Sequence, residues 1–336
     1  MTPSDDKTPI TDLNITTTKT TLVLHVSGGI RAQMVGNRVW SWFPVLKGTA
    51  PASMAGQSIE HIRGMAEAIG CTLFGGDEIS GLETPLPYRV WTPLHGPHSG
   101  KPQPADAWAS IAHNATEAND QDYTAFARHI AFSLRAAGSR IRDASDHYHT
   151  QLMAAIASKR QFGTRFSNIA MSDLQLAFHS ITSELCSARD YLAASLGDRM
   201  GAPEKIDAFS RLDDWTSTKG REQLRSQPVL AAMLSANDKS VTDPWLHHLT
   251  EYRNTFLHRT PLGASPLSSR LCYYKRSYEG FTIPLIEMPL GTDDLSAPRI
   301  DALHRFIDLH RKMTALLEHA AALAPYPTTP LHLGTL

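Results

Sequence analysis

The segment EYRNTFLHRTP, residues 251–261, combines residue types that can transfer protons and bind phosphate. Histidine titrates near neutral pH and can serve as a general acid or base. The planar guanidinium group of arginine matches phosphate oxygens and stabilises the negative charge that develops in a transition state. We therefore treat Arg253, Asn254 and His258 as candidate catalytic residues.

A helix over residues 243–258 must position these side chains. Asp243 before Pro244 predicts its start, and Thr260 before Pro261 predicts its end near His258. At about 100° per residue, one arc of this helix is apolar and contains Trp245, Leu249, Tyr252 and Phe256. The opposite arc is polar and contains His247, Glu251, Asn254 and His258.

Arg253 falls inside the apolar arc. In one interpretation its long side chain crosses the apolar surface to reach solvent. In the other it meets a partner anion or a subunit interface. His247 and Glu251, four residues apart, also suggest a metal site, but the sequence lacks a second ligand pair at metal spacing. We therefore expect neither a metal nor a cofactor.

The segment YRNTFLHR resembles the signature of HEPN domains (higher eukaryotes and prokaryotes nucleotide-binding), in which arginine and a polar residue precede a histidine. Arg253, Asn254 and His258 match it. Three other segments have the bare Arg-x4-His spacing but depart from the pattern: RDASDH (142–147), RIDALH (299–304) and RFIDLH (305–310). In the last two, Ile or Phe follows the arginine, and we expect these two to lie on an amphipathic C-terminal helix.

The resemblance implies a small helical bundle that forms a homodimer, with two motif helices facing each other in one composite site. It also implies a metal-independent endoribonuclease acting on RNA, as in toxins and antiviral defence effectors, with an antitoxin or regulatory protein as a further partner. The alternative is a non-catalytic HEPN-like module that binds a nucleotide, RNA or a protein.

RNA carries its own nucleophile, the 2′-hydroxyl group, so cleavage requires only proton transfer and charge stabilisation. His258 would act as general acid toward the 5′-oxygen, and Arg253 would stabilise the pentacoordinate phosphate. The two residues are five apart, about 140° around one helix, so an antiparallel partner helix would bring arginine and histidine together. Asn254 would orient the imidazole or the phosphate. The expected products carry a 2′,3′-cyclic phosphate and a 5′-hydroxyl.

Composition gives an ordinary globular balance, with 42% hydrophobic and 19% charged residues among 336 and a formal net charge of -1. The charge indicates no general affinity for nucleic acid, so RNA binding needs a local site. The three cysteines are Cys71, Cys186 and Cys272, and their wide spacing indicates a reducing compartment. We find no apolar run of the ~20 residues that cross a membrane, and we expect a cytoplasmic protein.

The expected fold class is mainly α: a HEPN-like helical bundle with an inserted β-hairpin and a smaller mixed α/β N-terminal region. We place the N-terminal region, of unknown role, at 1–103 and the helical domain at 104–336. Residues 1–19 are a polar lead-in, and a strand over 20–27 ends at the turn Gly28-Gly29. A helix covers 53–70, and 84–104, rich in proline and glycine, forms a linker.

Helical periodicity marks 105–117, 121–158, 168–196, 203–214, 219–235, 243–258 and 297–323. The segment 270–289 predicts the hairpin, with its turn at Glu279-Gly280. Its basic and aromatic residues either hold single-stranded RNA or pack against the bundle: Arg270, Tyr273, Tyr274, Lys275, Arg276 and Tyr278.

Overall fold

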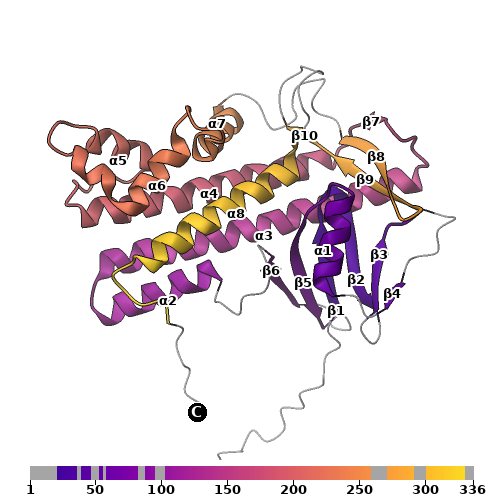
Figure 1. Cartoon of the computed structure of the whole chain (residues 1–336), viewed down its shortest axis with the longest axis horizontal. Helices are drawn as coiled ribbons and strands as arrows, with labels where there is room; N and C mark the ends of the chain where they lie inside the picture. Colours follow the sequence, from indigo (N-terminus) through magenta and orange to yellow (C-terminus); the bar gives the residue numbers. More distant parts are fainter. Residues whose placement is uncertain are drawn as a thin grey trace, which may run out of the picture.

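The computed structural model describes residues 21–35, 39–46, 53–55, 58–81, 88–94, 103–258, 271–290 and 300–329. Long helices follow the longest axis of the molecule, and a β-sheet lies beside one half of them (Figure 1). The mainly α fold class is confirmed. The expected lead-in at 1–19 lies outside the described residues.

The N-terminal sheet is antiparallel, with strand order β4-β3-β2-β1-β5-β6. Its strands are β1 (Thr21–Val26), β2 (Ile30–Val35), β3 (Val39–Phe43), β4 (Ser53–Ala55), β5 (Leu73–Ser80) and β6 (Tyr88–Pro93). The strand expected at 20–27 is confirmed. The linker expected at 84–104 is wrong in part, because β6 lies within it and pairs with β5.

Helix α1 (Ile59–Ala68) packs against the sheet through Ile62, Met65 and Ala66. The helix expected at 53–70 starts too early, since residues 53–55 form an edge strand. Ser58 is the N-cap, and its hydroxyl accepts a hydrogen bond from the backbone N–H of His61 at 3.2 Å. This cap satisfies one of the free N–H groups at the helix start.

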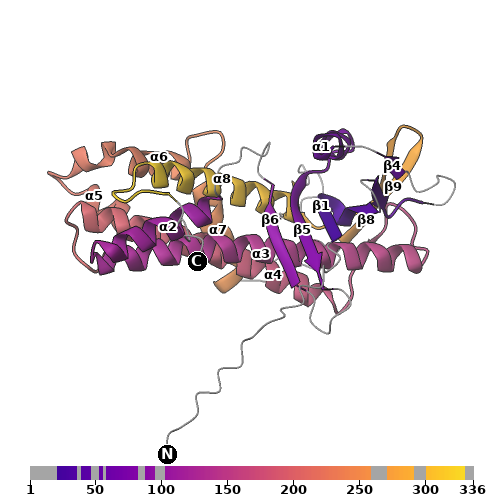
Figure 2. The same ribbon diagram turned by 90° about the horizontal axis from the view of Figure 1, so that it is seen from below.

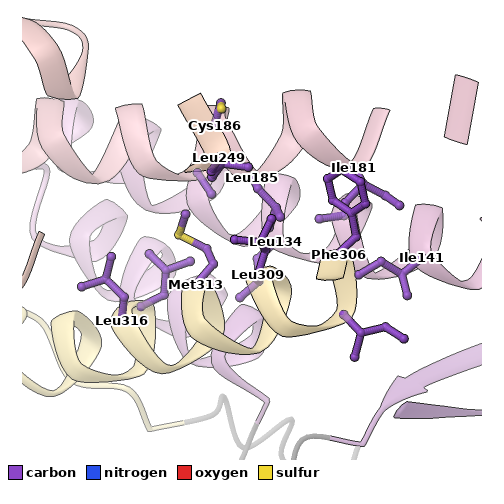
Figure 3. Packing of buried hydrophobic residues seen from close by; sticks show 14 of the residues in the cluster. Leu134, Ile141, Ile181, Leu185, Cys186, Leu249, Phe306, Leu309, Met313 and Leu316 are labelled. Atoms are coloured by element: carbon purple, nitrogen blue, oxygen red, sulfur yellow. The ribbon is translucent and has the colours of Figure 1, made fainter. Parts of the chain in front are cut away.

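Four long helices make the bundle: α2 (Pro104–Glu117), α3 (Gln121–Ala157), α4 (Met171–Arg199) and α8 (Ala302–Ala322). Seen from below, α3 and α4 extend past the end of α8, and strands β5 and β6 cross in front of them (Figure 2). Figure 3 shows apolar side chains from three of these helices and from α7 meeting in the core: Leu134, Ile141, Ile181, Leu185, Cys186, Leu249, Phe306, Leu309, Met313 and Leu316.

Shorter helices cover α4 and α8: α5 (Phe209–Thr216), α6 (Pro228–Asn237) and α7 (Trp245–His258), with a 3-10 turn η2 (Glu222–Ser226). The helix expected at 219–235 is divided, because Pro228 starts a new helix at its first position. The helix expected from 297 begins at Ala302. Asp301 caps it by accepting a hydrogen bond from the backbone N–H of His304 at 3.0 Å.

The expected hairpin is confirmed as β8 (Leu271–Tyr278) and β9 (Phe281–Glu287), with positive φ at Glu279 and Gly280. Strand β7 (Arg165–Phe166) extends it to three strands, and β10 (Pro289–Leu290) pairs with β11 (Ile300–Asp301). Ile283 and Leu285 of the hairpin share one apolar core with the N-terminal sheet. The hairpin thus ties the sheet to the bundle.

The turn η1 (Ser27–Gly29) brings the sheet into close contact with α3. A Cβ atom on Gly29 would lie 2.8 Å from the carbonyl oxygen of Tyr148, and φ at Gly29 is +84°. Such a contact is too short for any side chain, and the positive φ favours glycine. The glycine pair that predicted a turn therefore also allows the N-terminal sheet to pack against helix α3 of the bundle.

Candidate functional site

Helix α7 presents its apolar arc to the bundle. Leu246, Leu249 and Phe256 are buried, and the ring of Phe256 stacks on His179 of α4 with centroids 4.9 Å apart. Asp243 was expected to cap this helix. Its carboxylate instead bonds Lys312 of α8, and it accepts a hydrogen bond from Arg305 at 3.3 Å. The predicted helix is confirmed, but these contacts tie its start to α8.

Arg253 lies half-buried on the face of α7 that packs on α4. It is close enough to Cys186 of α4 that its charge acts on the thiol, whose pKa burial raises to about 11 and Arg253 pulls down. We find no hydrogen bond or ion pair between Arg253 and any other described residue. The placement within the apolar arc thus agrees with the sequence, and no anion within the described residues neutralises the guanidinium.

Two neighbouring arginines show what a paired guanidinium looks like in this bundle. Arg189 of α4 is buried, donates to the hydroxyl of Thr250 at 2.6 Å and bonds Asp190 at 2.9 Å. Arg305 of α8 donates to Asp308 at 2.8 Å and lies 2.8 Å from Nδ1 of His248. Both join helices, whereas Arg253 makes no such bond.

The polar arc of α7 faces outward. Asn254 and Glu251 are exposed, and Nε2 of His247 lies 3.6 Å from the carboxylate of Glu251. His258 is the last residue of α7, and its side chain lies outside the described residues. The structure therefore brings Arg253 and Asn254 together on the last turns of one helix, and it does not describe the position of the His258 imidazole.

Among the described residues no group of three histidine, cysteine or carboxylate side chains is arranged to hold a metal ion. The pair His247 and Glu251 forms, but no third ligand from the described part of the chain joins it. The three cysteines are free and buried. Within the same residues, no helix has the length and apolar character to cross a membrane.

The other Arg-x4-His segments serve other roles. Arg142 bonds its neighbour Asp143 at 3.1 Å. In RFIDLH, Arg305 is tied to α7, and His310 is buried, with its pKa lowered by burial to about 4. RIDALH spans the start of α8, and its Arg299 lies outside the described residues. RFIDLH therefore lies on the amphipathic C-terminal helix α8, as expected, with His310 on its buried side.

Two roles were predicted for the basic and aromatic residues of the hairpin: binding of RNA, or packing against the bundle. Tyr273 is buried and stacks on Phe162 with ring centroids 4.7 Å apart, so this tyrosine packs rather than binds RNA. Lys275 and Arg276 are exposed, with Arg276 at 3.7 Å from Glu287. Arg270 lies outside the described residues.

A partly buried ionic cluster joins the N-terminal sheet to α3: His25, Arg31 and Asp77 are buried, and Arg89 and Asp146 are partly exposed. Asp77 of β5 lies 3.2 Å from Nε2 of His25 and also bonds Arg89 of β6. Asp146 of α3 bonds Arg89 at 2.8 Å and Arg31 of β2 at 2.9 Å. Burial, with help from Arg31, lowers the pKa of His25 to about 4, so this histidine is neutral. No sequence pattern predicts this cluster, because its members come from distant segments.

Beside this cluster is a cavity of about 440 Å³ between β6 and helices α2, α3 and α8. Three arginines line it, Arg89, Arg135 and Arg142, together with Trp91 and the buried Thr314. None of them was a candidate residue by sequence except Arg142, as part of RDASDH. The signal that could have revealed the cavity is Gly138, an isolated glycine in the middle of a long helix.

No family model, curated protein or solved structure matches the chain.

Proposed function

We propose that the protein is a metal-independent endoribonuclease of HEPN type that cleaves RNA as a homodimer. The observation that carries the proposal is Arg253: a half-buried arginine whose guanidinium makes no bond to any described residue, next to the exposed Asn254 on the last turns of α7. A guanidinium without a bonded carboxylate is available to bind an anion.

In the proposed reaction the 2′-hydroxyl of RNA gives its proton to solvent water and its oxygen attacks the adjacent phosphate. Arg253 stabilises the extra negative charge on the phosphate oxygens, and His258 of the other subunit protonates the departing 5′-oxygen. Asn254 orients the phosphate or the imidazole. The 2′-oxygen forms a bond to phosphorus as the bond to the 5′-oxygen breaks, leaving a 2′,3′-cyclic phosphate and a 5′-hydroxyl.

The helix end favours this role for His258. The C-terminus of a helix carries a partial negative charge, which stabilises a protonated imidazole by ~0.3–1 kcal/mol in exposed positions. A protonated histidine is the form that a general acid requires. An enzyme of this kind would act as a toxin or an antiviral effector, kept in check by an antitoxin or regulatory protein.

The test is cleavage of end-labelled single-stranded RNA by the purified protein, with and without EDTA. We expect fragments ending in 2′,3′-cyclic phosphate and 5′-hydroxyl, equal rates in EDTA, and loss of cleavage in His258→Ala. Products with 5′-phosphate ends, or a His258→Ala variant as active as the wild type, would contradict the proposal.

A further inference from the structure

A shallow groove lies between α2 and α3, two helices that run side by side (Figure 1). Its volume is about 670 Å³, within the ~300–1,000 Å³ range of clefts that hold small ligands. Ala112 and Ala131, both buried, form its floor. Because these side chains are small, the groove has room for a group from outside the chain.

An exposed aromatic ring lines this groove. Phe132 of α3 is 65% exposed. Phenylalanine is among the residues that are most often buried, and its exposure gives up the free energy that burial of the ring would contribute. A ring in this position can instead stack on a flat ring of a bound molecule.

Phe132 lies between two arginines on the same side of α3. Arg128 comes four residues before it and Arg135 three residues after it, and these spacings place all three on one face of the helix. All three line the groove. The two arginines are seven residues apart, which is ~10 Å along the helix axis.

Both guanidinium groups retain donors for an anion. Arg128 donates to the hydroxyl of Thr116 at 3.5 Å and bonds no carboxylate of the described residues. Arg135 donates to Asp106 through one nitrogen at 2.9 Å, and a guanidinium carries five N–H donors. Among the described residues that line the groove, none is acidic. The groove is therefore complementary in charge to an anionic chain.

Two histidines also line the groove, one from each helix. His113 of α2 is half-buried, and His129 of α3 is exposed. The imidazole of His129 stacks on Tyr191 of α4, with ring centroids 4.5 Å apart and an angle of 13° between the planes. Imidazole nitrogens can bond to phosphate oxygens or to base edges.

We infer that this groove binds a single-stranded nucleic acid. One base stacks on Phe132, and phosphates on either side of that base bind Arg128 and Arg135. Proteins that bind single strands combine basic grooves with aromatic side chains in this manner. An acidic polypeptide matches the charge of the groove, but its carboxylates offer no flat ring to the phenyl group.

The site goes beyond the proposed ribonuclease reaction. It shares no residue with α7, and its contacts are to phosphates and bases, which RNA and DNA have in common. Stacking on Phe132 requires an unpaired base, because the bases of a duplex are stacked on one another.

The experiment is fluorescence anisotropy of the full-length protein with two labelled strands, an oligodeoxythymidylate and a 2′-O-methyl oligouridylate. Each strand has about twelve nucleotides, within the ~4–16 that single-strand sites cover. We expect saturable binding of both, and binding at least ~10-fold weaker when either strand is paired in a duplex. Absence of saturable binding, or equally strong competition by a glutamate peptide of the same charge, would overturn the inference.

Variants locate the site. Phe132→Ala should weaken binding ~5-fold or more. Tyr88→Ala is the matched control, since this aromatic residue of β6 is 74% exposed and lies outside the groove. Arg128→Gln should weaken binding and lower the slope of log affinity against log salt by ~0.7. Arg211→Gln, at an exposed arginine paired with Asp207 at 2.7 Å, should change neither quantity.

Binding of these strands is independent of cleavage, because neither carries the free 2′-hydroxyl that the proposed reaction uses. A protein that binds both strands through Phe132 but leaves ordinary RNA intact would support the groove and contradict the ribonuclease. A protein that cleaves RNA but binds the strands equally well after Phe132→Ala would overturn the groove alone.

Discussion

Two regions of this molecule contain buried or half-buried arginines, and they differ in whether the guanidinium groups bond a carboxylate. Where the N-terminal sheet meets α3, Arg31 and Arg89 share the carboxylates of Asp77 and Asp146. At the end of α7, Arg253 is half-buried and bonds no described residue.

Breaking a buried ion pair costs several kcal/mol because it leaves a charge without a partner, so the cluster at the sheet is expected to hold the two halves together. A guanidinium without a partner contributes little to folding but is ready to bind an anion. We therefore expect mutations in the first region to affect stability, and mutations in the second to affect chemistry.

The largest expected effect is on cleavage by Arg253→Ala. Loss of a group that stabilises transition-state charge should lower the rate of RNA cleavage by ~10²–10³-fold. The free energy of unfolding should change by less than about 1 kcal/mol, since no described bond is lost. Labelled-RNA cleavage and urea denaturation measure the two quantities.

Arg189→Ala, on the neighbouring helix, is the control for that variant. It removes a buried guanidinium from the half-buried Asp190 and Thr250, and should lower the free energy of unfolding by at least ~2 kcal/mol. If Arg253→Ala is the more destabilising of the two, Arg253 has a structural role.

The next largest effect is expected for Asp77→Ala at the sheet. Asp77 is fully buried, and its loss leaves Arg89 and His25 facing a gap. The free energy of unfolding should fall by about 3 kcal/mol, as seen in urea. Asp207→Ala removes an exposed pair and should cost no more than ~0.5 kcal/mol. An equal loss of unfolding free energy in the two variants would show that the cluster does not hold the N-terminal sheet to the helical bundle.

A smaller effect is expected from pH. Burial lowers the pKa of His25 and of His310 from 6.5 to about 4, so between these values the unfolded chain binds two protons that the folded chain does not. Burial raises the pKa of Asp301 to about 7, which acts in the opposite direction by one proton. These three groups together should lower the free energy of unfolding by ~1.4 kcal/mol per pH unit as pH drops from 6.5 to 4. Burial also lowers the pKa of four other histidines, which adds to the fall: His149, His179, His248 and His304.

Urea denaturation at pH 6.5 and pH 5 measures this change. His25→Gln keeps a donor for Asp77 but cannot take up a proton, so its stability should depend less on pH. A wild-type protein equally stable at both values would contradict the neutral state of the two histidines.

The sequence predicted elements whose signals are local. The periodicity of α2 and α3, the turn at Glu279-Gly280 and the helix that carries Arg253 are all confirmed. The strand β6 was missed because prolines and glycines surround it and its pairing partner, β5, supplies the reason for it to form. The start of α1 was misplaced because Ser58, rather than Ser53, is the cap.

The candidate site was predictable only in part. Spacing placed Arg253 on the buried arc and Asn254 on the exposed one, as the structure shows. Pairing between distant residues is invisible in a single sequence, so the cluster around Asp77 and the cavity above Gly138 could not be foreseen. Nor could it be foreseen that Arg305, from α8, would lie against α7.

The most direct test of the central claim is complementation between two inactive variants. In a symmetric dimer that combines Arg253→Ala with His258→Ala chains, one composite site keeps both its arginine and its histidine, and the other has neither. After subunit exchange at equal concentrations we expect about a quarter of the wild-type cleavage rate, because half of the dimers are mixed and each has one intact site. A mixture no more active than either variant alone, under conditions where the wild type cleaves RNA, would contradict the account.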